Sequence, residues 1–159
     1  MSDDARFADG GDRPLRLKAM DADDLQVIAT LVQDAVFPAN EMRWDRKRRR
    51  FALLLNRFRW EDKNRAERHG GEFERVQSVL AIDDVVRVAS QGVSRGDADT
   101  VLSLLTLGFE PGEDGTGALF LTLAGDGAIK VDVEALDVTL HDATRPYRAP
   151  SGRAPDHPE

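Results

Sequence analysis

The sequence predicts an α+β fold: a strongly curved antiparallel sheet or partly closed barrel of six to eight strands with one N-terminal helix. One segment, residues 21–36, carries apolar residues at helical spacing. Most later segments alternate apolar and polar residues, which is typical of strands. In the last segment the apolar positions change phase near Glu134-Ala135, which indicates a β-bulge and a bent strand. Two related folds fit the same pattern: a barrel with the helix as plug or lid, and a sandwich with the helix outside.

A single long helix is predicted to begin after Asp21. Its carboxylate can accept hydrogen bonds from the free N–H groups of the first turn, so it is a good N-cap. Pro38 cannot continue a helix, and we expect the helix to end before it. The expected buried stripe comprises Leu25, Ile28, Ala29, Val32, Ala35 and Val36.

A β-hairpin is predicted for "EMRW" (41–44) and "RFALLLNRFRW" (50–60), with a four-residue loop containing a type I turn around residues 45–48. The expected register places Trp44 opposite Arg49 and Met42 opposite Phe51. The second strand is apolar on both faces, so we expect it to be central in the sheet. Further strands are expected at 15–20, 73–82, 85–90, 100–109, 118–124 and 128–140.

Length and composition favour one soluble domain, residues 14–142 of the 159. The acidic segment 1–13 and the proline-rich segment 143–159 are expected to be disordered. The absence of cysteine excludes disulfides, thiolate nucleophiles and zinc sites built on sulfur. No signal peptide and no apolar run near the ~20 residues of a membrane helix is visible, so we expect a cytoplasmic protein without membrane contact.

The charge is distributed unevenly along the chain. Residues 43–68 hold eleven Arg and Lys and four Asp and Glu, which gives this segment a charge of +7. Because the net charge of the whole chain is −7, the rest of the chain carries −14. Such asymmetry indicates an interaction surface. The candidate partner- or anion-binding residues are Arg46, Lys47, Arg48, Arg49, Arg50, Arg57, Arg59, Trp44 and Trp60.

These residues admit different interpretations. The five consecutive cations 46–50 could track phosphates with a tryptophan stacking on a base, contact an acidic protein, or serve only as a solvated turn that guards a sheet edge. Arg57 and Arg59 alternate with aromatic residues, which predicts either an anion-binding groove or a strand with one solvated face.

No catalytic constellation, metal site or cofactor is predicted. The three histidines lie apart in the sequence, and a metal site needs several converging ligands. His141 beside Asp142 could act as a general base with an orienting carboxylate, but no nucleophile is identifiable nearby in the sequence.

The run "RRFALLLNRFRWE" (49–61), together with "GAIKVDVEALDVTL" (127–140), resembles a bacterial family of proteins of unknown function, family 2948. The resemblance spans about Leu15 to Asp142. It implies no particular activity, cofactor or catalytic residue.

The expected function is therefore a non-catalytic binding or assembly module that contacts a protein partner or a second copy through the basic hairpin, residues 43–59. One alternative is binding of RNA or another polyanion by the same hairpin. A second alternative is an enzyme for a small anionic metabolite, with Arg57 or Arg59 holding the anion and His141 or an aspartate moving the proton.

Overall fold

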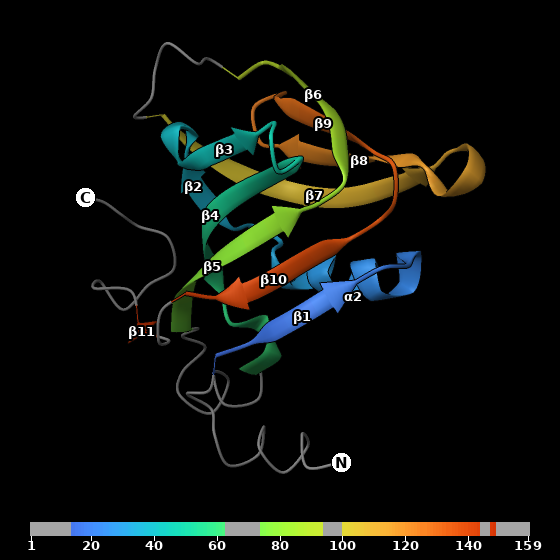
Figure 1. The fold of residues 1–159 in the computed structure, drawn as a ribbon. Helices are drawn as coiled ribbons and strands as arrows, with labels where there is room; N and C mark the ends of the chain where they lie inside the picture. Colours follow the sequence, from blue (N-terminus) through green and yellow to red (C-terminus); the bar gives the residue numbers. More distant parts are fainter. Residues whose placement is uncertain (1–13, 63–73, 94–99, 144–146, 149–159) are drawn as a thin grey trace, which may run out of the picture.

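The computed structural model describes residues 14–62, 74–93, 100–143 and 147–148 (Figure 1). These ranges contain one α-helix and eleven strands, and every pair of hydrogen-bonded strands is antiparallel. The α+β class and the mostly antiparallel sheet are confirmed. The elements are β1 (Arg16–Ala19), α2 (Ala22–Leu31), β2 (Val36–Pro38), η1 (Ala39–Glu41), β3 (Met42–Asp45), β4 (Arg50–Phe58), η2 (Trp60–Asp62), β5 (Glu74–Ile82), β6 (Val85–Gln91), β7 (Val101–Pro111), η3 (Glu113–Gly115), β8 (Gly117–Leu123), β9 (Ala128–Val133), β10 (Val138–Asp142) and β11 (Tyr147–Arg148).

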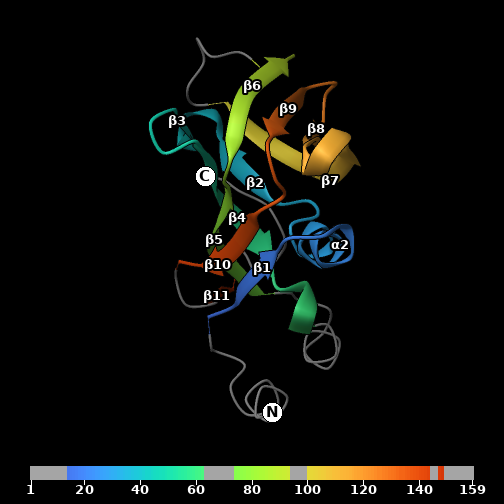
Figure 2. The same ribbon diagram turned by 45° about the vertical axis from the view of Figure 1, so that its right-hand side comes forward.

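Helix α2 begins as predicted and ends earlier than predicted. The Asp21 carboxylate accepts a hydrogen bond from the backbone N–H of Asp24 at 2.8 Å, which is the expected N-cap. The helix ends at Leu31, and Asp34 takes a left-handed conformation with φ of 64°. Pro38 does not end the helix but closes the short strand β2. The helix packs against β1 and β7 (Figure 2).

The strand order is β1-β10-β5-β4-β2-β7-β8-β9-β6, with β3 on β4 and β11 on β5. Strands β1, β10, β5 and β4 form one half of the sheet, and β7, β8, β9 and β6 form the other half (Figure 1). The short strand β2 joins the two halves because it pairs with both β4 and β7.

The chain passes between the halves twice, and the two crossings are hydrogen-bonded to each other. It leaves β5 for β6 at Asp83-Asp84 and returns from β9 to β10 over residues 134–137. The N–H of Asp83 donates to the carbonyl of Asp137, and the N–H of Glu134 donates to the carbonyl of Asp84, both at 2.9 Å. The predicted bulged strand 128–140 is therefore wrong, because its change of apolar phase marks the end of one strand and the start of another.

The predicted strand number and shape are also wrong. The described ranges hold eleven strands, ten of them three residues or longer, against the six to eight expected. The sheet is open because β1 and β6 end the strand order and do not pair with each other, and it is not strongly curled. The additional strands arise from the division of 128–140 and from the short strands β2 and β11, which carry too few residues for a visible alternation.

A hydrophobic cluster lies between the two halves and the helix. It joins residues of β4, β5 and β10 to residues of β7, β8 and β9, and α2 adds Leu25 and Ile28. Strand β4 is central as predicted, since β5 pairs with one edge and β3 and β2 pair with the other. Its Leu53 and Leu55 are buried, and Ala52 is half-buried on the other face.

Segment 1–13, expected to be disordered, lies outside the described residues. The same holds for most of the predicted tail 143–159, of which Tyr147–Arg148 forms β11 on β5. Among the described residues, no helix is long and apolar enough to cross a membrane.

Candidate binding surface

The predicted hairpin is formed by β3 and β4, with a register two residues away from the expected one. Asp45 pairs with Arg50 and Trp44 pairs with Phe51, so the loop comprises residues 46–49. The expected pairings of Trp44 with Arg49 and of Met42 with Phe51 are wrong because Asp45 continues the strand, and Met42 pairs with Leu53. A shift of two residues leaves each side chain on the face predicted for it, since strand side chains alternate with period two.

The loop is fixed to the start of β6 through Arg49. The N–H of Val85 donates to the Arg49 carbonyl at 3.0 Å, and the Arg49 Nε donates to the Val85 carbonyl at 3.4 Å. The backbone of Arg49 has φ of 57°, a left-handed conformation that is uncommon for residues other than glycine. Its guanidinium also forms an ion pair with Glu134 in the second crossing. These contacts hold the hairpin loop against the other half of the sheet.

Two of the five consecutive cations are thus engaged within the molecule. Besides the Arg49 pair, Arg50 Nε donates to Asp83 Oδ1 at 2.8 Å. The hydrogen bond and the charge of Asp83 raise the pKa of the Arg50 guanidinium. Both arginines therefore help to position the hairpin instead of offering free charge.

The other three cations, Arg46, Lys47 and Arg48, form the cationic tip. All three are exposed, and none has an ion pair with another described residue. The backbone of the tip is ordered by the Asp45 carboxylate, which accepts a hydrogen bond from the N–H of Arg48 at 3.2 Å. Of the five consecutive cations in the sequence, these three are the ones that the described part of the structure leaves without an ion pair.

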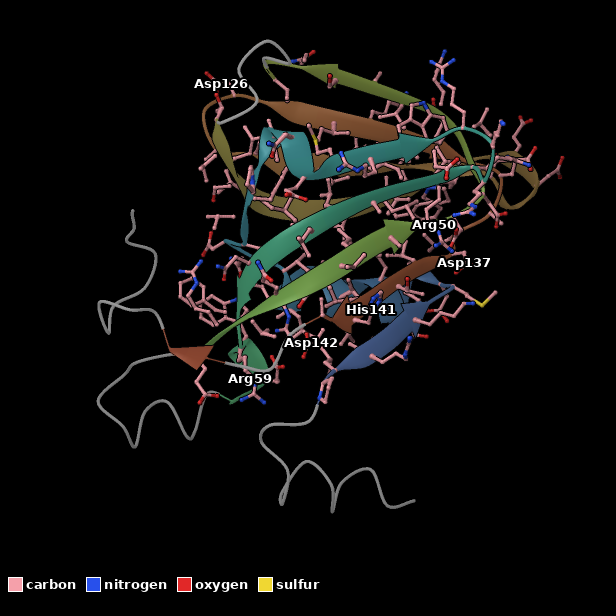
Figure 3. The ribbon with its side chains drawn as sticks, turned by 60° about the vertical axis from the view of Figure 1, so that its left-hand side comes forward. Arg50, Arg59, Asp126, Asp137, His141 and Asp142 are labelled. Atoms are coloured by element: carbon pink, nitrogen blue, oxygen red, sulfur yellow. The ribbon has the colours of Figure 1, made fainter. Side chains whose placement is uncertain are left out.

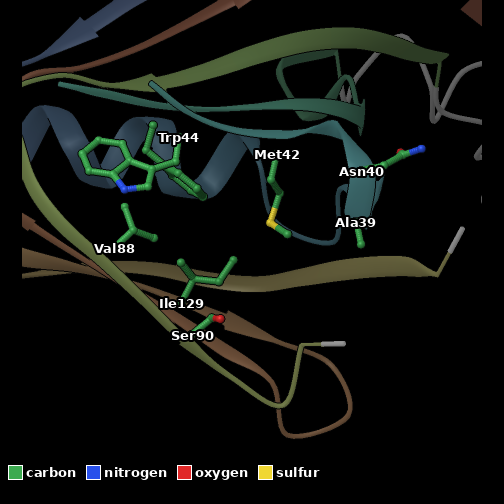
Figure 4. A pocket seen from close by; sticks show the side chains of 8 residues that line it. Ala39, Asn40, Met42, Trp44, Val88, Ser90 and Ile129 are labelled. Atoms are coloured by element: carbon green, nitrogen blue, oxygen red, sulfur yellow. The ribbon is translucent and has the colours of Figure 1, made fainter. Parts of the chain in front are cut away.

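Trp44 lies at the foot of the cationic tip and is half-buried. It lines an apolar pocket of about 280 Å³ between β3 and β6, here named the Trp44 pocket (Figure 4). Trp44 also lines two more open hollows that include Arg46, one of them with Lys47 and the other with Arg49. The hollow with Arg49 also contains Glu134 and Asp132, which pair with Arg49 and Arg87, so Arg46 is its cation without an ion pair among the described residues. The Trp44 indole is therefore a wall of both the apolar pocket and the hollows that contain Arg46. The residues of the Trp44 pocket are Ala39, Asn40, Met42, Trp44, Phe51, Val88, Ser90 and Ile129.

Arg57 lies at the other end of β4 and is fully buried. Arg57 is seven residues after Arg50 on the same strand, roughly 23 Å at 3.3 Å per residue. Figure 3 shows Arg50 and Arg59 near opposite ends of the β4–β5 pair. The nine candidate residues therefore belong to two separate places, and the structure does not bring them together as one site.

The Arg57 guanidinium is satisfied entirely by the protein itself. Its two terminal nitrogens donate to the Glu61 carboxylate, each at 2.9 Å, and one of them also donates to Asp142 Oδ1 at 3.0 Å. Its Nε donates to Ser78 Oγ at 2.9 Å. Burial alone would lower the pKa of Arg57, but the hydrogen bonds and charges of Glu61 and Asp142 outweigh burial and raise it. The same pairing lowers the pKa of Glu61 against the effect of its own burial.

Arg59 and Trp60 are likewise committed to the fold. Arg59 is 4% exposed and donates from Nη1 to Glu74 Oε1 at 2.6 Å. The Trp60 indole N–H donates to the Gln33 carbonyl at 3.0 Å, and its ring lies 5.1 Å from the ring of Phe58. Both interpretations of Arg57 and Arg59, an anion-binding groove and a solvated strand face, are wrong because the guanidinium groups are buried against carboxylates of the chain.

The sequence contained a signal for this buried ionic cluster. Phe51, Leu53 and Leu55 occupy the buried odd-numbered face of β4, Arg57 continues that face, and Arg59 follows at the next odd position, one residue beyond the strand. Alternate side chains of an extended segment point to the same side, so the pattern predicts that the two arginines are buried. A buried guanidinium group needs acidic partners. Glu61 follows Arg57 by four residues, whereas Glu74 and Ser78 come from β5 and Asp142 from β10, so no local pattern indicated these last three partners.

His141 and Asp142 do not form the general-base pair considered from the sequence. Asp142 is buried, and its Oδ1 accepts from Arg57 and Ser78 while its Oδ2 accepts from the N–H of Leu15. Successive residues of a strand point to opposite faces, so the half-buried His141 is directed away from this carboxylate. Asp142 therefore stabilises the junction of β1, β4, β5 and β10.

The chain matches the family described as "Protein of unknown function (DUF2948)" over residues 15–157, and it belongs to that family. No curated protein and no solved structure matches the chain.

Proposed function

We propose that this member of the DUF2948 family is a non-catalytic binding module that contacts an acidic protein partner through the cationic tip. The observation that carries the proposal is the set of three adjacent, exposed cations, Arg46, Lys47 and Arg48, that have no ion-pair partner among the described residues. The neighbouring arginines, which do have such partners, hold the tip in place.

The net negative charge of the protein does not cancel the attraction at the tip. Exposed charges are screened over a Debye length of about 8 Å in physiological salt. The tip lies at the end of a hairpin whose own two acids, Asp45 and the more distant Glu41, are outnumbered by cations. The local positive potential therefore acts on a partner that approaches this end of the molecule.

Acidic protein is a better match than nucleic acid for this surface. Of the two candidate stacking residues, Trp60 is engaged with Phe58 and Gln33 at the far end of β4, and Trp44 forms a pocket wall. Three cations also give a modest electrostatic contribution, a salt slope of about −2 for single strands at −0.7 per phosphate. The enzyme alternative loses its anion-holding group because Arg57 is fully buried and saturated with internal hydrogen bonds.

The test compares binding of fluorescent polyglutamate and polyuridylate to the wild type by anisotropy, at 50 and 500 mM salt. We expect polyglutamate to bind at low salt and to weaken at least tenfold at high salt. The double variant Arg46→Glu/Arg48→Glu should lose this binding. Its matched control is Arg16→Glu/Lys18→Glu, which makes the same change of charge on the exposed side of β1 and should retain binding.

Three results would overturn the proposal. These are equal loss in the control variant, no loss in the tip variant, or tighter binding of polyuridylate, which would establish the polyanion alternative. Sedimentation of the wild type at the same two salt concentrations identifies whether the acidic partner is a second copy of this chain, because that association would disappear at high salt.

A further inference from the structure

The Trp44 pocket has the size of a site for one large side chain. Its volume of about 280 Å³ lies just below the range of roughly 300–1,000 Å³ typical of small-molecule sites. Met42, Phe51 and Val88 supply apolar walls, while the exposed Asn40 and Ser90 lie where the pocket meets solvent. A buried aromatic or aliphatic anchor in such a pocket is the usual source of binding energy at a protein interface.

The two strands that border the pocket each have one open edge. Within the described ranges, β3 pairs only with β4, and β6 pairs only with β9. An open edge offers backbone N–H and carbonyl groups to a peptide in extended conformation. β6 is the longer edge, with seven residues compared with four in β3. Its first residue, Val85, is already hydrogen-bonded to Arg49, which leaves residues 86–91 for a peptide.

Every second side chain of β6 near its open edge faces the Trp44 pocket. Val88 and Ser90 line the pocket, and the intervening Ala89 does not. Side chains of directly paired residues on adjacent strands share a face. A peptide paired with β6 would therefore direct every second side chain toward the Trp44 pocket.

We propose that an extended, acidic segment of a partner protein pairs with the open edge of β6 and places one bulky apolar side chain in the Trp44 pocket. This inference rests on the proposed function, because the acidic residues of the segment would lie against the cationic tip. Charge complementarity selects the occupant: Arg46 lines the hollows next to the pocket, and Trp44 is the common wall.

The experiment uses two fluorescein-labelled nonapeptides, each with eight glutamates and a central residue that is phenylalanine in one and serine in the other. Anisotropy titrations give their dissociation constants for the full chain. Because burial of one aromatic side chain strengthens binding by about ten- to a hundredfold, we expect the phenylalanine peptide to bind at least tenfold tighter.

A pair of variants locates the anchor. Ser90→Phe fills the pocket from its exposed rim and should abolish the preference for phenylalanine while the weaker, salt-dependent binding remains. Gln91→Phe adds the same side chain at the next exposed position, outside the pocket lining, and should preserve the preference. Circular dichroism melting of both variants confirms that they fold.

The failure of this inference is distinguishable from the failure of the proposed function. Equal binding of both peptides, lost in Arg46→Glu/Arg48→Glu, overturns the anchor and leaves the cationic tip as the contact. A preference that survives in Ser90→Phe, or disappears in Gln91→Phe, also overturns the assignment to this pocket. If neither peptide binds at 50 mM salt, both proposals fail.

Discussion

Arg57 and Asp142 lie 85 positions apart in the sequence, and the Arg57 Nη2 donates to the Asp142 Oδ1 at 3.0 Å inside the protein. The side chains are 0% and 1% exposed, so water does not screen the pair. Through Asp142 the contact reaches the backbone of Leu15 in front of β1, and through Ser78 it reaches β5. The ionic cluster thus connects the two ends of the folded chain to its central strand.

Replacement Arg57→Met is expected to destabilise the protein by about 3–5 kcal/mol, because it leaves the Glu61 and Asp142 carboxylates buried without their cation. Urea unfolding followed by circular dichroism measures the loss. The control Arg46→Met removes an exposed cation of the tip and should change the free energy of unfolding by no more than ~0.5 kcal/mol. A loss below about 1 kcal/mol for Arg57→Met would contradict a structural role of the cluster.

The stability of the protein is expected to fall as the pH drops below the ordinary glutamate pKa of 4.5. Burial opposes ionisation of Glu61, but its hydrogen bonds to Arg57 prevail and lower its pKa in the folded state. A carboxylate with a depressed folded pKa contributes stability fully above its unfolded pKa and loses it as the pH falls through the folded pKa. Urea midpoints measured from pH 6 to pH 2 should decline more steeply in the wild type than in Glu61→Gln. Parallel curves would refute the assignment.

The sequence was sufficient to predict elements whose signals are local. The N-cap at Asp21 depends on side chains within a few residues of one another, and it is present. The breaks between the predicted strands 73–82 and 85–90 and between 118–124 and the strand that begins at residue 128 are likewise local, and both are present. The sequence predicted a cationic turn but not which of its five cations would lack an ion pair, because the partners of Arg49 and Arg50 are the distant Glu134 and Asp83.

Features that depend on distant pairing could not be obtained in this way. The phase change at Glu134-Ala135 fits a bulge and a strand boundary equally well, and only the pairing of β9 with β8 and of β10 with β5 separates them. The Trp44 pocket likewise brings β3 together with β6 and β9, across the fold, so no local pattern indicated it.

Loss of the helix N-cap by Asp21→Ala is expected to cost about 1 kcal/mol, since the N–H of Asp24 loses its acceptor at the start of α2. Thermal melting and urea unfolding both measure this change. The matched variant Asp23→Ala removes an exposed acid of the same turn that is not the N-cap residue, and should cost less than half as much. Equal effects of the two substitutions would show that helix-dipole charge, and not the cap, is what matters.

Gly117 at the start of β8 is expected to tolerate no side chain. A Cβ there would lie 2.5 Å from the Phe109 ring and 2.7 Å from the Glu110 carbonyl oxygen on the paired strand β7, and the carbonyl belongs to a ladder that cannot move freely. Such overpacking typically costs about 1–3 kcal/mol, so Gly117→Ala should lower the free energy of unfolding by that amount.

Gly108→Ala provides the comparison within the same pair of strands. A Cβ at Gly108 meets no atom within 4 Å, and its backbone is not in the left-handed region, so the substitution should be neutral or stabilising by up to about 1 kcal/mol through the unfolded state. Urea unfolding of the two variants under identical conditions should therefore give opposite or clearly separated shifts. If the two variants had the same free energy of unfolding, the close contact of Phe109 and Glu110 with Gly117 would not be what excludes a side chain at this position.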